Sequence, residues 1–160
     1  MRLQLGGYST VTMTDRWFQE LRAGRGFQGF NTVAAVAGQY SHVQLKNPAA
    51  SGKQAIVAQA SIIMNSTSWV SVLIYDADLA TDSGAVANAL LGGAASACHM
   101  RGEANAAMFG TEIDRIYILL NTVTTLWPSW GPELSPGKGV LFAPDTVNLG
   151  ITGKLIFNEV

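Results

Sequence analysis

Three aspartates stand close together in the middle of the chain. Asp76, Asp78 and Asp82 form the pattern D-x-D-x-x-x-D after an apolar run. Hard cations such as calcium bind carboxylate oxygens that cluster on a flexible loop. The EF-hand pattern fails here, because Thr81 stands where its glycine is required and no glutamate closes the loop. We therefore interpret the three aspartates as solvated turn residues. They are weak candidates for a metal site, and we expect no metal and no cofactor.

Few other residues offer nucleophilic or metal-binding chemistry. Cys98 is the only cysteine, it stands beside His99, and the second histidine is His42. Zinc needs about four ligands at matched spacing, and neighbouring residues on a strand point to opposite faces. Neither a zinc site nor a Cys–His nucleophile is therefore favoured. The sequence also has no phosphate-binding glycine loop and no G-x-S-x-G elbow. These patterns indicate a protein that is not an enzyme.

The most unusual segment is W-P-S-W-G-P at residues 127–132. Trp127 and Trp130 stand in a loop that two prolines make rigid. Exposed aromatic side chains of this kind stack on a sugar ring or anchor a protein partner. The other interpretation is that one or both tryptophans close the open end of the core, as large aromatics usually do. The sequence leaves both interpretations open.

Charged residues are sparse. Only 21 of the 160 residues carry a charge, or 13%, against about 25% in an ordinary globular domain. The hydrophobic fraction of 48% and the net charge of −1 exclude a disordered chain, and the lack of a basic stripe argues against nucleic-acid binding. The longest uncharged run holds too many polar residues to span a membrane as one helix. Because charge is depleted where subunits meet, the composition indicates an oligomer.

Short segments in which apolar and polar residues alternate begin near residue 39. They cover residues 43–46, 56–64, 69–75, 115–120, 140–143 and 149–158. Asn, Pro and Gly turns separate them, and this period of two is typical of strands. The pattern predicts an all-β antiparallel sandwich or barrel for residues 38–160. Residues 85–97 are ambiguous between a short helix and an edge strand.

The N-terminal residues differ in composition from the rest and predict an arm over residues 1–37. Residues 15–22 read as a two-turn helix that Thr14 caps and Gly24 ends. Two turns do not persist alone in water, so the helix must dock on a surface. The docking residues that we expect are Trp17, Phe18, Leu21, Arg16, Arg22 and Arg25.

Three parts of the chain resemble small virion proteins of tailed bacteriophages. They are residues 40–53, which end in N-P-A-A-S-G-K, the segment L-G-G-A-A-S at 91–96, and the ending with P-G-K-G-V at 136–140 and G-K-L-I-F-N-E-V at 153–160. The resemblance covers roughly residues 38–160. It implies a β-sandwich of jelly-roll type that assembles on a phage particle, as a head decoration, a collar or a fibre tip. It implies no cofactor and no catalytic residue.

These observations lead to one main functional hypothesis and one rival. We expect a non-enzymatic virion protein, made in the host cytoplasm, that forms a homo-oligomer, most plausibly a trimer, through a low-charge face of the sandwich. Its arm would dock on another capsid, neck or tail protein, and neither nucleic acid nor a membrane is expected as a partner. The rival is a fibre-tip module that binds a glycan receptor through Trp127 and Trp130.

Overall fold

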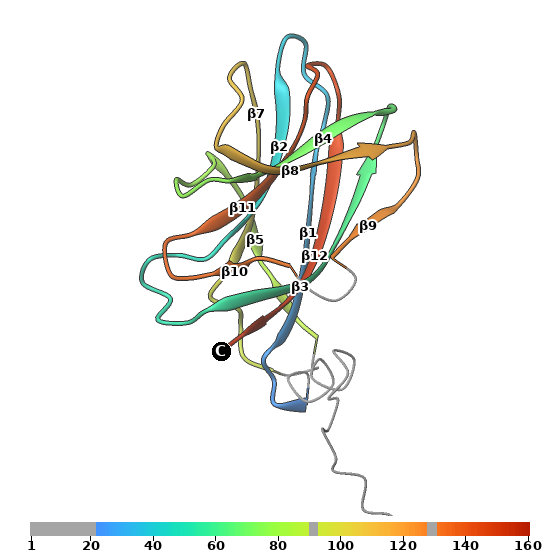
Figure 1. The fold of residues 1–160 in the computed structure, drawn as a ribbon. Coiled ribbons are helices and arrows are strands. Elements are labelled where there is room, and N and C mark those ends of the chain that lie inside the picture. The colour runs from blue at the N-terminus through green and yellow to red at the C-terminus, as the bar shows by residue number, and fades with distance from the viewer. Residues whose placement is uncertain (1–21, 90–92, 128–130) are drawn as a thin grey trace, which may run out of the picture.

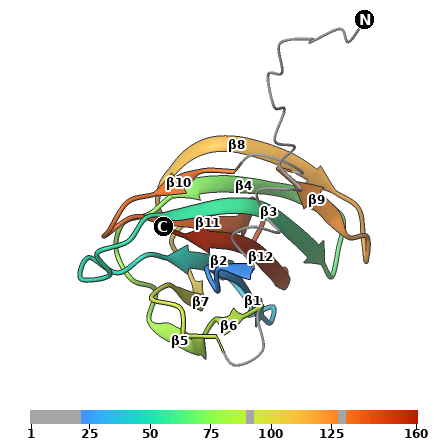
Figure 2. The same cartoon turned by 90° about the horizontal axis from the view of Figure 1, so that it is seen from below.

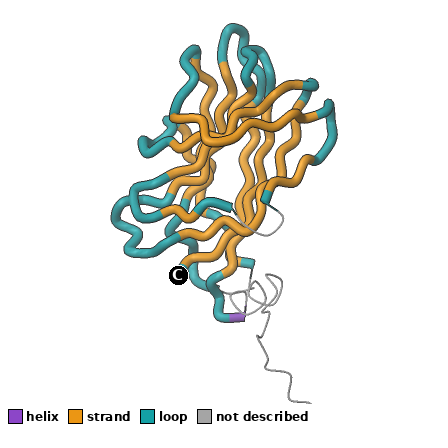
Figure 3. The backbone as a smooth tube through the Cα atoms, in the orientation of Figure 1, coloured by secondary structure: helices purple, strands orange, loops and turns teal. Residues whose placement is uncertain are grey.

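The computed structural model describes residues 22–89, 93–127 and 131–160, with the backbone alone for residues 82–85. The described residues form twelve strands in two antiparallel sheets that pack face to face as a β-sandwich (Figure 1). Loops join the strands at the two ends of the sandwich (Figure 3). The all-β antiparallel fold that the alternating segments predicted is therefore confirmed. No helix in the described residues is long and apolar enough to cross a membrane.

The first sheet, sheet A, contains the first and the last strand of the described chain. Its strands are β1 (Gly26–Val33), β3 (Ala55–Met64), β6 (Ala87–Asn88), β9 (Thr124–Leu126), β10 (Glu133–Leu134) and β12 (Ile151–Glu159). They lie in the order β10-β3-β12-β1-β6, and β9 pairs with β3 beside β10. Strand β12 thus lies between β3 and β1, at the centre of the sheet.

The second sheet, sheet B, holds the remaining strands. They are β2 (Tyr40–Lys46), β4 (Ser68–Ile74), β5 (Thr81–Ala85), β7 (His99–Asn105), β8 (Thr111–Ile118) and β11 (Gly139–Pro144). Their order is β5-β7-β2-β11-β4-β8. Strand β11 lies between β2 and β4, as β12 does between β1 and β3 in sheet A.

Strand pairing follows a nested pattern along the chain. Strand β1 pairs with β12, β2 with β11, β3 with β9 and β10, and β4 with β8. Strands β5, β6 and β7 interrupt the series, and Figure 2 shows them together along one side of the sandwich, away from β8. There β7 pairs with β2 and β6 with β1.

The core fills the space between the sheets. Its largest side chains include Phe27, Phe142 and Phe157, all buried, and the rings of Phe27 and Phe157 stack at 5.7 Å. Gly29 faces this core, where an added Cβ would lie 2.6 Å from the Met100 side chain. The glycine is therefore a packing requirement in the middle of a strand.

A buried carboxylate fixes the C-terminal strand to its neighbours. Glu159 is 1% exposed, and it accepts hydrogen bonds from the Ser96 hydroxyl, from the backbone N–H groups of Ala97 and Cys98, and from the Lys53 ammonium at 3.0 Å. Burial alone would raise the pKa of Glu159, but these hydrogen bonds outweigh it and lower the pKa. The carboxylate thus stays charged and holds the 96–98 loop against β12.

The structure differs from the sequence-based expectation at the N-terminal boundary. Residues 26–33 were expected in the arm, but they form β1 and pair with β12 along all eight residues. The sandwich therefore begins before residue 37. The helix expected at residues 15–22 lies outside the described residues except for Arg22. In the described part of 85–97, Ala87–Asn88 is an edge strand, and residues 85–89 and 93–97 contain no helix.

Candidate interaction surface

The outer face of sheet A is an open surface of the described chain. Side chains of β3 and β12 alternate between buried and accessible positions, as in a sheet with one face on the core and one toward solvent. The outward side chains, read from this alternation and the strand register, are Gln28, Phe30, Thr32, Ile56, Gln59, Ser61, Ile63, Thr125, Glu133, Thr152, Lys154 and Ile156. We call this set the open face. Only Lys154 and Glu133 in it carry charge, and their charges are opposite.

The open face carries one prominent apolar side chain. Phe30 is 71% exposed, the highest value among the exposed large hydrophobic residues of the described chain. Across the strands it lies beside Lys154 of β12, which in turn lies beside Ser61 of β3. A phenyl ring left in water on a nearly uncharged sheet face is typical of a surface that another molecule covers.

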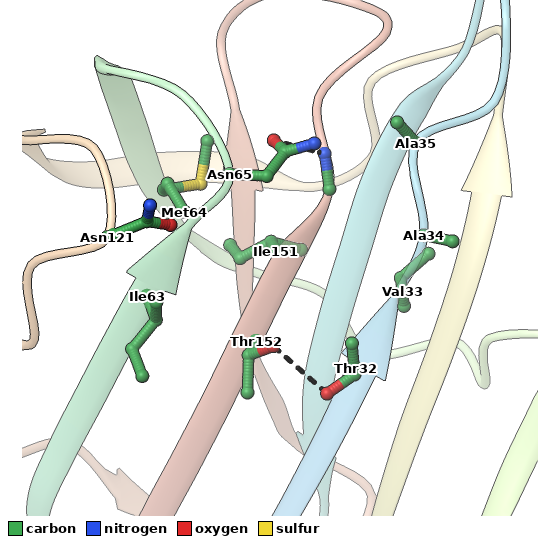
Figure 4. Close-up of a pocket in the computed structure, with 11 residues that line it drawn as sticks. Thr32, Val33, Ala34, Ala35, Ile63, Met64, Asn65, Asn121, Ile151 and Thr152 are labelled. Carbon is green, nitrogen blue, oxygen red and sulfur yellow. Dashed lines mark hydrogen bonds between the residues drawn. The ribbon is translucent and has the colours of Figure 1, made fainter.

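One end of the open face is hollowed. A depression of about 360 Å³ lies over the start of β12, between the ends of β1 and β3 (Figure 4). Figure 4 shows Thr32 and Thr152 joined by a hydrogen bond of 2.9 Å, with Ile63 on the neighbouring strand. The hollow is lined by Thr32, Val33, Ala34, Ala35, Ile63, Met64, Asn65, Asn121, Gly150, Ile151 and Thr152. Gly150, which directly precedes β12, is one of its lining residues.

Two loops of the chain itself cover part of the outer face of sheet B, over β2, β11 and the end of β4. Leu79 from the β4–β5 loop packs with Leu73, Leu141 and Ala143 of the sheet, and Tyr75 and Phe109 pack against this second core. The ring of Phe109 stacks on Tyr75 at 5.1 Å. Strands β2 and β11 are consequently buried on both faces along almost their whole length.

Buried polar side chains hold the first of these loops in place. The Gln44 amide donates to the carbonyl oxygens of Tyr75 and Ala77, both at 2.9 Å, and its Oε1 accepts from the Leu79 N–H. The Lys46 ammonium donates to the carbonyl oxygens of Asp76 and Gly137. Burial lowers the pKa of Lys46, although the nearby carboxylates of Asp78 and Asp76 oppose this effect.

His42 lies under the same covering layer. It is fully buried, neither ring nitrogen has a hydrogen-bond partner, and its ring is 4.8 Å from that of Phe109. Burial lowers the pKa of His42, while the backbone of Glu103 and Tyr40 and the Glu103 carboxylate act in the opposite direction. The imidazole is therefore neutral at pH 7 and packs as an aromatic ring.

A second exposed patch lies at the edge of sheet B. Trp69 and Tyr117 are cross-strand partners, 46% and 52% exposed, with ring centroids 5.2 Å apart. The Arg115 guanidinium lies 5.3 Å from the Trp69 ring centre and pairs with Asp145. The composition of Trp, Tyr and Arg is that of binding hot spots.

The residues expected to dock the arm fall mostly outside the described chain. Trp17, Phe18, Leu21 and Arg16 lie among residues 1–21, and only Arg22 and Arg25 are described. Both are exposed and stand directly before β1.

The structure separates the two tryptophans that were candidates for ligand binding. Trp127 is half-buried and packs on the core, with its ring 5.8 Å from that of Phe142 and a backbone φ of 48°. Trp130 lies outside the described residues. Trp127 therefore fills the end of the core, which was one of the two interpretations of this segment.

The aspartates that were weak metal candidates have cationic partners. Asp76 pairs with Lys138 at 2.5 Å, and Asp78 lies 3.5 Å from Arg101. The side chain of Asp82 is not described. Among the described residues, no group of three His, Cys, Asp or Glu side chains could hold a metal ion.

The lone thiol is buried beside the Glu159 carboxylate. Burial raises the pKa of Cys98, and the negative charge of Glu159 raises it further. The nucleophilic thiolate is thus disfavoured, and Cys98 packs as a small apolar side chain of the core.

Sparse charge was the sequence signal for the open face, and it identified no individual residue. Sparse charge indicated an uncharged sandwich face, but Phe30 and Thr32 were placed in the arm. Only their pairing with β12 brings them onto the same surface as Ile63 and Thr152.

No family model, no curated protein and no solved structure matches this chain. The likeness of residues 40–53 and 136–160 to phage virion proteins therefore stays a resemblance.

Proposed function

We propose that this protein is a non-enzymatic structural protein of a tailed-phage virion that assembles with copies of itself through the open face. The observation that carries the proposal is that the open face of sheet A exposes apolar side chains to solvent but carries almost no charged side chains. Phe30 and Ile63 are exposed there, and Lys154 and Glu133 are the only charged members of the open face. Interfaces between subunits are depleted of charge in the same way.

The size of the open face supports a stable contact. It spans five strand positions, or about 24 Å at about 4.8 Å per strand. Along the nine residues of β12 it measures about 30 Å. Only β1, β3 and β12 run along this whole length, and the two- and three-residue strands β6, β9 and β10 cover part of it. The face therefore measures about 550 Å², or about two thirds of the roughly 800 Å² that each partner contributes to a standard interface.

The order of strand pairing supports a jelly roll as the type of sandwich. Nested pairs β1–β12, β2–β11, β3–β9 and β4–β8 correspond to one long hairpin that is rolled up. The additional ladders β12–β3 and β11–β4 join the nested pairs into the four-strand sets β1-β12-β3-β9 and β2-β11-β4-β8, and β5, β6, β7 and β10 complete the two six-stranded sheets. Jelly rolls of eight strands are common in viral capsid and lectin domains, which agrees with the resemblance to virion proteins.

The arm gives the proposal its second contact. Trp17, Phe18 and Leu21 would supply apolar area, and Arg16, Arg22 and Arg25 would meet an acidic surface on a neighbouring capsid, neck or tail protein. Arg22 and Arg25 emerge at the start of β1, so an arm that begins there can reach a neighbour without disturbing the sandwich.

Sedimentation of the purified chain tests the self-association. At tens of micromolar we expect a species larger than the 17.0 kDa chain; a contact made open face to open face gives twice this mass, in place of the trimer expected from the sequence. Ser61→Arg puts a charge in the middle of the open face and should release monomers. Ala77→Arg, on the exposed loop over sheet B, is the matched control and should leave the oligomer intact. A monomeric wild-type chain would overturn the proposal.

Truncation tests the arm separately. Because residues 26–33 belong to sheet A, the deletion should end at residue 21. This variant should keep its oligomeric state and lose attachment to the particle. Loss of both properties together would show that residues 1–21 belong to the self-association surface, which contradicts a docking arm.

The β4–β8 edge favours a second candidate function, binding of a glycan. Trp69 and Tyr117 expose aromatic surface beside the polar groups of Arg115, Glu112 and Asp145, an arrangement that can stack on a sugar ring and bond its hydroxyls. Trp69→Ala with Tyr117→Ala should abolish binding on a glycan array while the variant stays folded. Binding that survives this double substitution would exclude the edge as the site.

A further inference from the structure

The open face carries a protrusion and a depression that lie close together. Phe30 and Thr32 are two residues apart on β1, so their Cα atoms are about 7 Å apart along the strand. Phe30 projects into solvent with 71% of its surface exposed, and Thr32 lines the hollow of about 360 Å³. The most exposed large hydrophobic side chain of the face thus stands beside its hollow.

We propose that Phe30 of one copy of this chain inserts into the hollow of a second copy, and that Phe30 of the second copy inserts into the hollow of the first. This inference rests on the proposed self-association and names the contact that produces it. Two copies stacked open face to open face around a two-fold axis make the same contact twice, as symmetry requires of such pairs.

The hollow has the size and the lining for a phenyl ring. A cavity of about 150 Å³ with an apolar lining takes up a benzene ring, and this hollow has more than twice that volume. Val33, Ile63, Met64 and Ile151 contribute apolar surface. The Asn65 side chain already accepts the N–H of Gly150 at 2.9 Å, and the hydroxyls of Thr32 and Thr152 bond each other. These three polar groups therefore do not need a polar ligand.

A second copy fits better than other occupants of the hollow. The area of the open face, about 550 Å² from its strand spacing and strand lengths, is larger than a small ligand would cover and is about two thirds of one side of a standard interface. Its two charges are of opposite sign, so two copies do not repel each other. The ring that would fill the hollow also already lies on the same face.

A pair of charge variants tests the contact. Phe30→Lys places an ammonium where the ring would enter an apolar hollow, and Thr152→Glu places a carboxylate inside the hollow. We expect each single variant to self-associate at least about a hundredfold more weakly than the wild-type chain, because each loses a central aromatic contact that the pair makes twice. An equimolar mixture should associate again, because the lysine of one chain then meets the glutamate of the other while the second contact stays native.

A matched control keeps the test specific to the hollow. Thr125→Glu places the same charge on the open face but outside the hollow lining, and it should not restore association when mixed with Phe30→Lys. Sedimentation of each chain and mixture gives the readout, and the circular dichroism spectrum checks that each variant stays folded.

The outcomes separate this inference from the proposed function. If Ser61→Arg dissociates the oligomer but Phe30→Lys does not, Phe30 is not the inserted residue, and the open face remains the interface. If both single variants dissociate and the mixture does not recover, the hollow is not the partner of Phe30, and the inference is likewise overturned. If Thr152→Glu dissociates the oligomer and Phe30→Lys does not, a group other than Phe30 of the second copy occupies the hollow, and the inference is overturned. A monomeric wild-type chain overturns both proposals.

Discussion

The two outer faces of the sandwich differ in how their apolar side chains are covered. On sheet B, the chain covers its own apolar residues, because Leu79 and Phe109 come down from two loops onto Leu73 and Leu141. On sheet A, no loop of the described chain packs a comparable cluster on the outside, and Phe30 stays exposed. Over β2 and β11 the subunit thus covers its own sheet, whereas Phe30 on the open face has no such cover from the described chain.

The distribution of charge follows this difference. Strands of sheet B carry Lys46, Asp82, Arg101, Glu103, Glu112, Asp114 and Arg115, whereas strands of sheet A carry only Glu133, Lys154 and Glu159. Glu159 is buried, so two charges remain on the open face. Charged groups gather where the chain bonds its own covering loop, and they are sparse where we propose that a subunit binds.

The largest expected difference between the faces concerns stability. Leu141→Ala removes a fully buried side chain and leaves a cavity under the loop, which should cost about 2–5 kcal/mol of unfolding free energy. Ile156→Ala, on the open face, removes a side chain that is only partly buried and should cost the dissociated chain less than about 1 kcal/mol. Urea unfolding below the association threshold measures both values.

Equal losses for Leu141→Ala and Ile156→Ala would contradict this contrast. They would mean that the open face is as well packed within one subunit as the covered face is. Ile156→Ala should instead show its larger effect in the strength of self-association.

A smaller loss of unfolding free energy is expected when a polar side chain under the covering loop is removed. Gln44→Ala removes the amide that bonds Tyr75, Ala77 and Leu79. Their buried backbone groups then lack a partner, which should cost about 1–3 kcal/mol and speed hydrogen exchange in the β4–β5 loop. Gln59→Ala on the open face is the matched control and should stay within about 0.5 kcal/mol. Unchanged exchange in the loop of Gln44→Ala would refute the role of this amide.

Periodicity predicted the strands whose two faces differ, and it missed residues whose environment comes from elsewhere in the chain. Strand β12 shows the cleanest alternation, with Leu155 and Phe157 inward and Lys154 outward, and it was predicted almost to its bounds. Strand β1 reads as flexible because of its glycines. Gly29 is nevertheless required by the Met100 side chain, which lies some seventy residues further along the chain.

The covering loops and the hollow could not be predicted from the sequence, because they too depend on contacts between distant parts of the chain. Leu79 stands alone among polar and small residues, and Phe109 follows Ala106, Ala107 and Met108 in a short loop, so no period of two or of 3.6 marks either residue. The hollow is lined by the ends of β1 and β3 and the start of β12, and bringing Thr152 beside Ile63 needs the β3–β12 register. Sparse charge could predict that an uncharged face exists, but it could not indicate which sheet provides it.

The lysine on the open face gives a prediction of opposite sign. Lys154 is exposed in one subunit, but it loses water when a second copy covers the face, and lysine is depleted at such interfaces. Lys154→Met should therefore strengthen self-association about tenfold, or about 1.4 kcal/mol. Lys138→Met, which removes a lysine beside the covered face, should leave association unchanged. Weaker association of Lys154→Met would contradict this prediction and would indicate an ion pair across the interface.

The smallest expected effect is a pH dependence that belongs to the covered face. Burial lowers the pKa of His42 below its ordinary value of 6.5, so as the pH falls through this value the unfolded chain binds a proton that the folded chain does not. The free energy of unfolding must then decrease as the pH is lowered, by at most about 1.4 kcal/mol per pH unit for one group. In His42→Leu, the decrease in unfolding free energy from pH 7.5 to pH 5.5 should be smaller than in the wild-type chain. Phe109→Ala, which uncovers the imidazole, should flatten it partly. A wild-type slope that both variants retain would show that the covering layer does not exclude the proton.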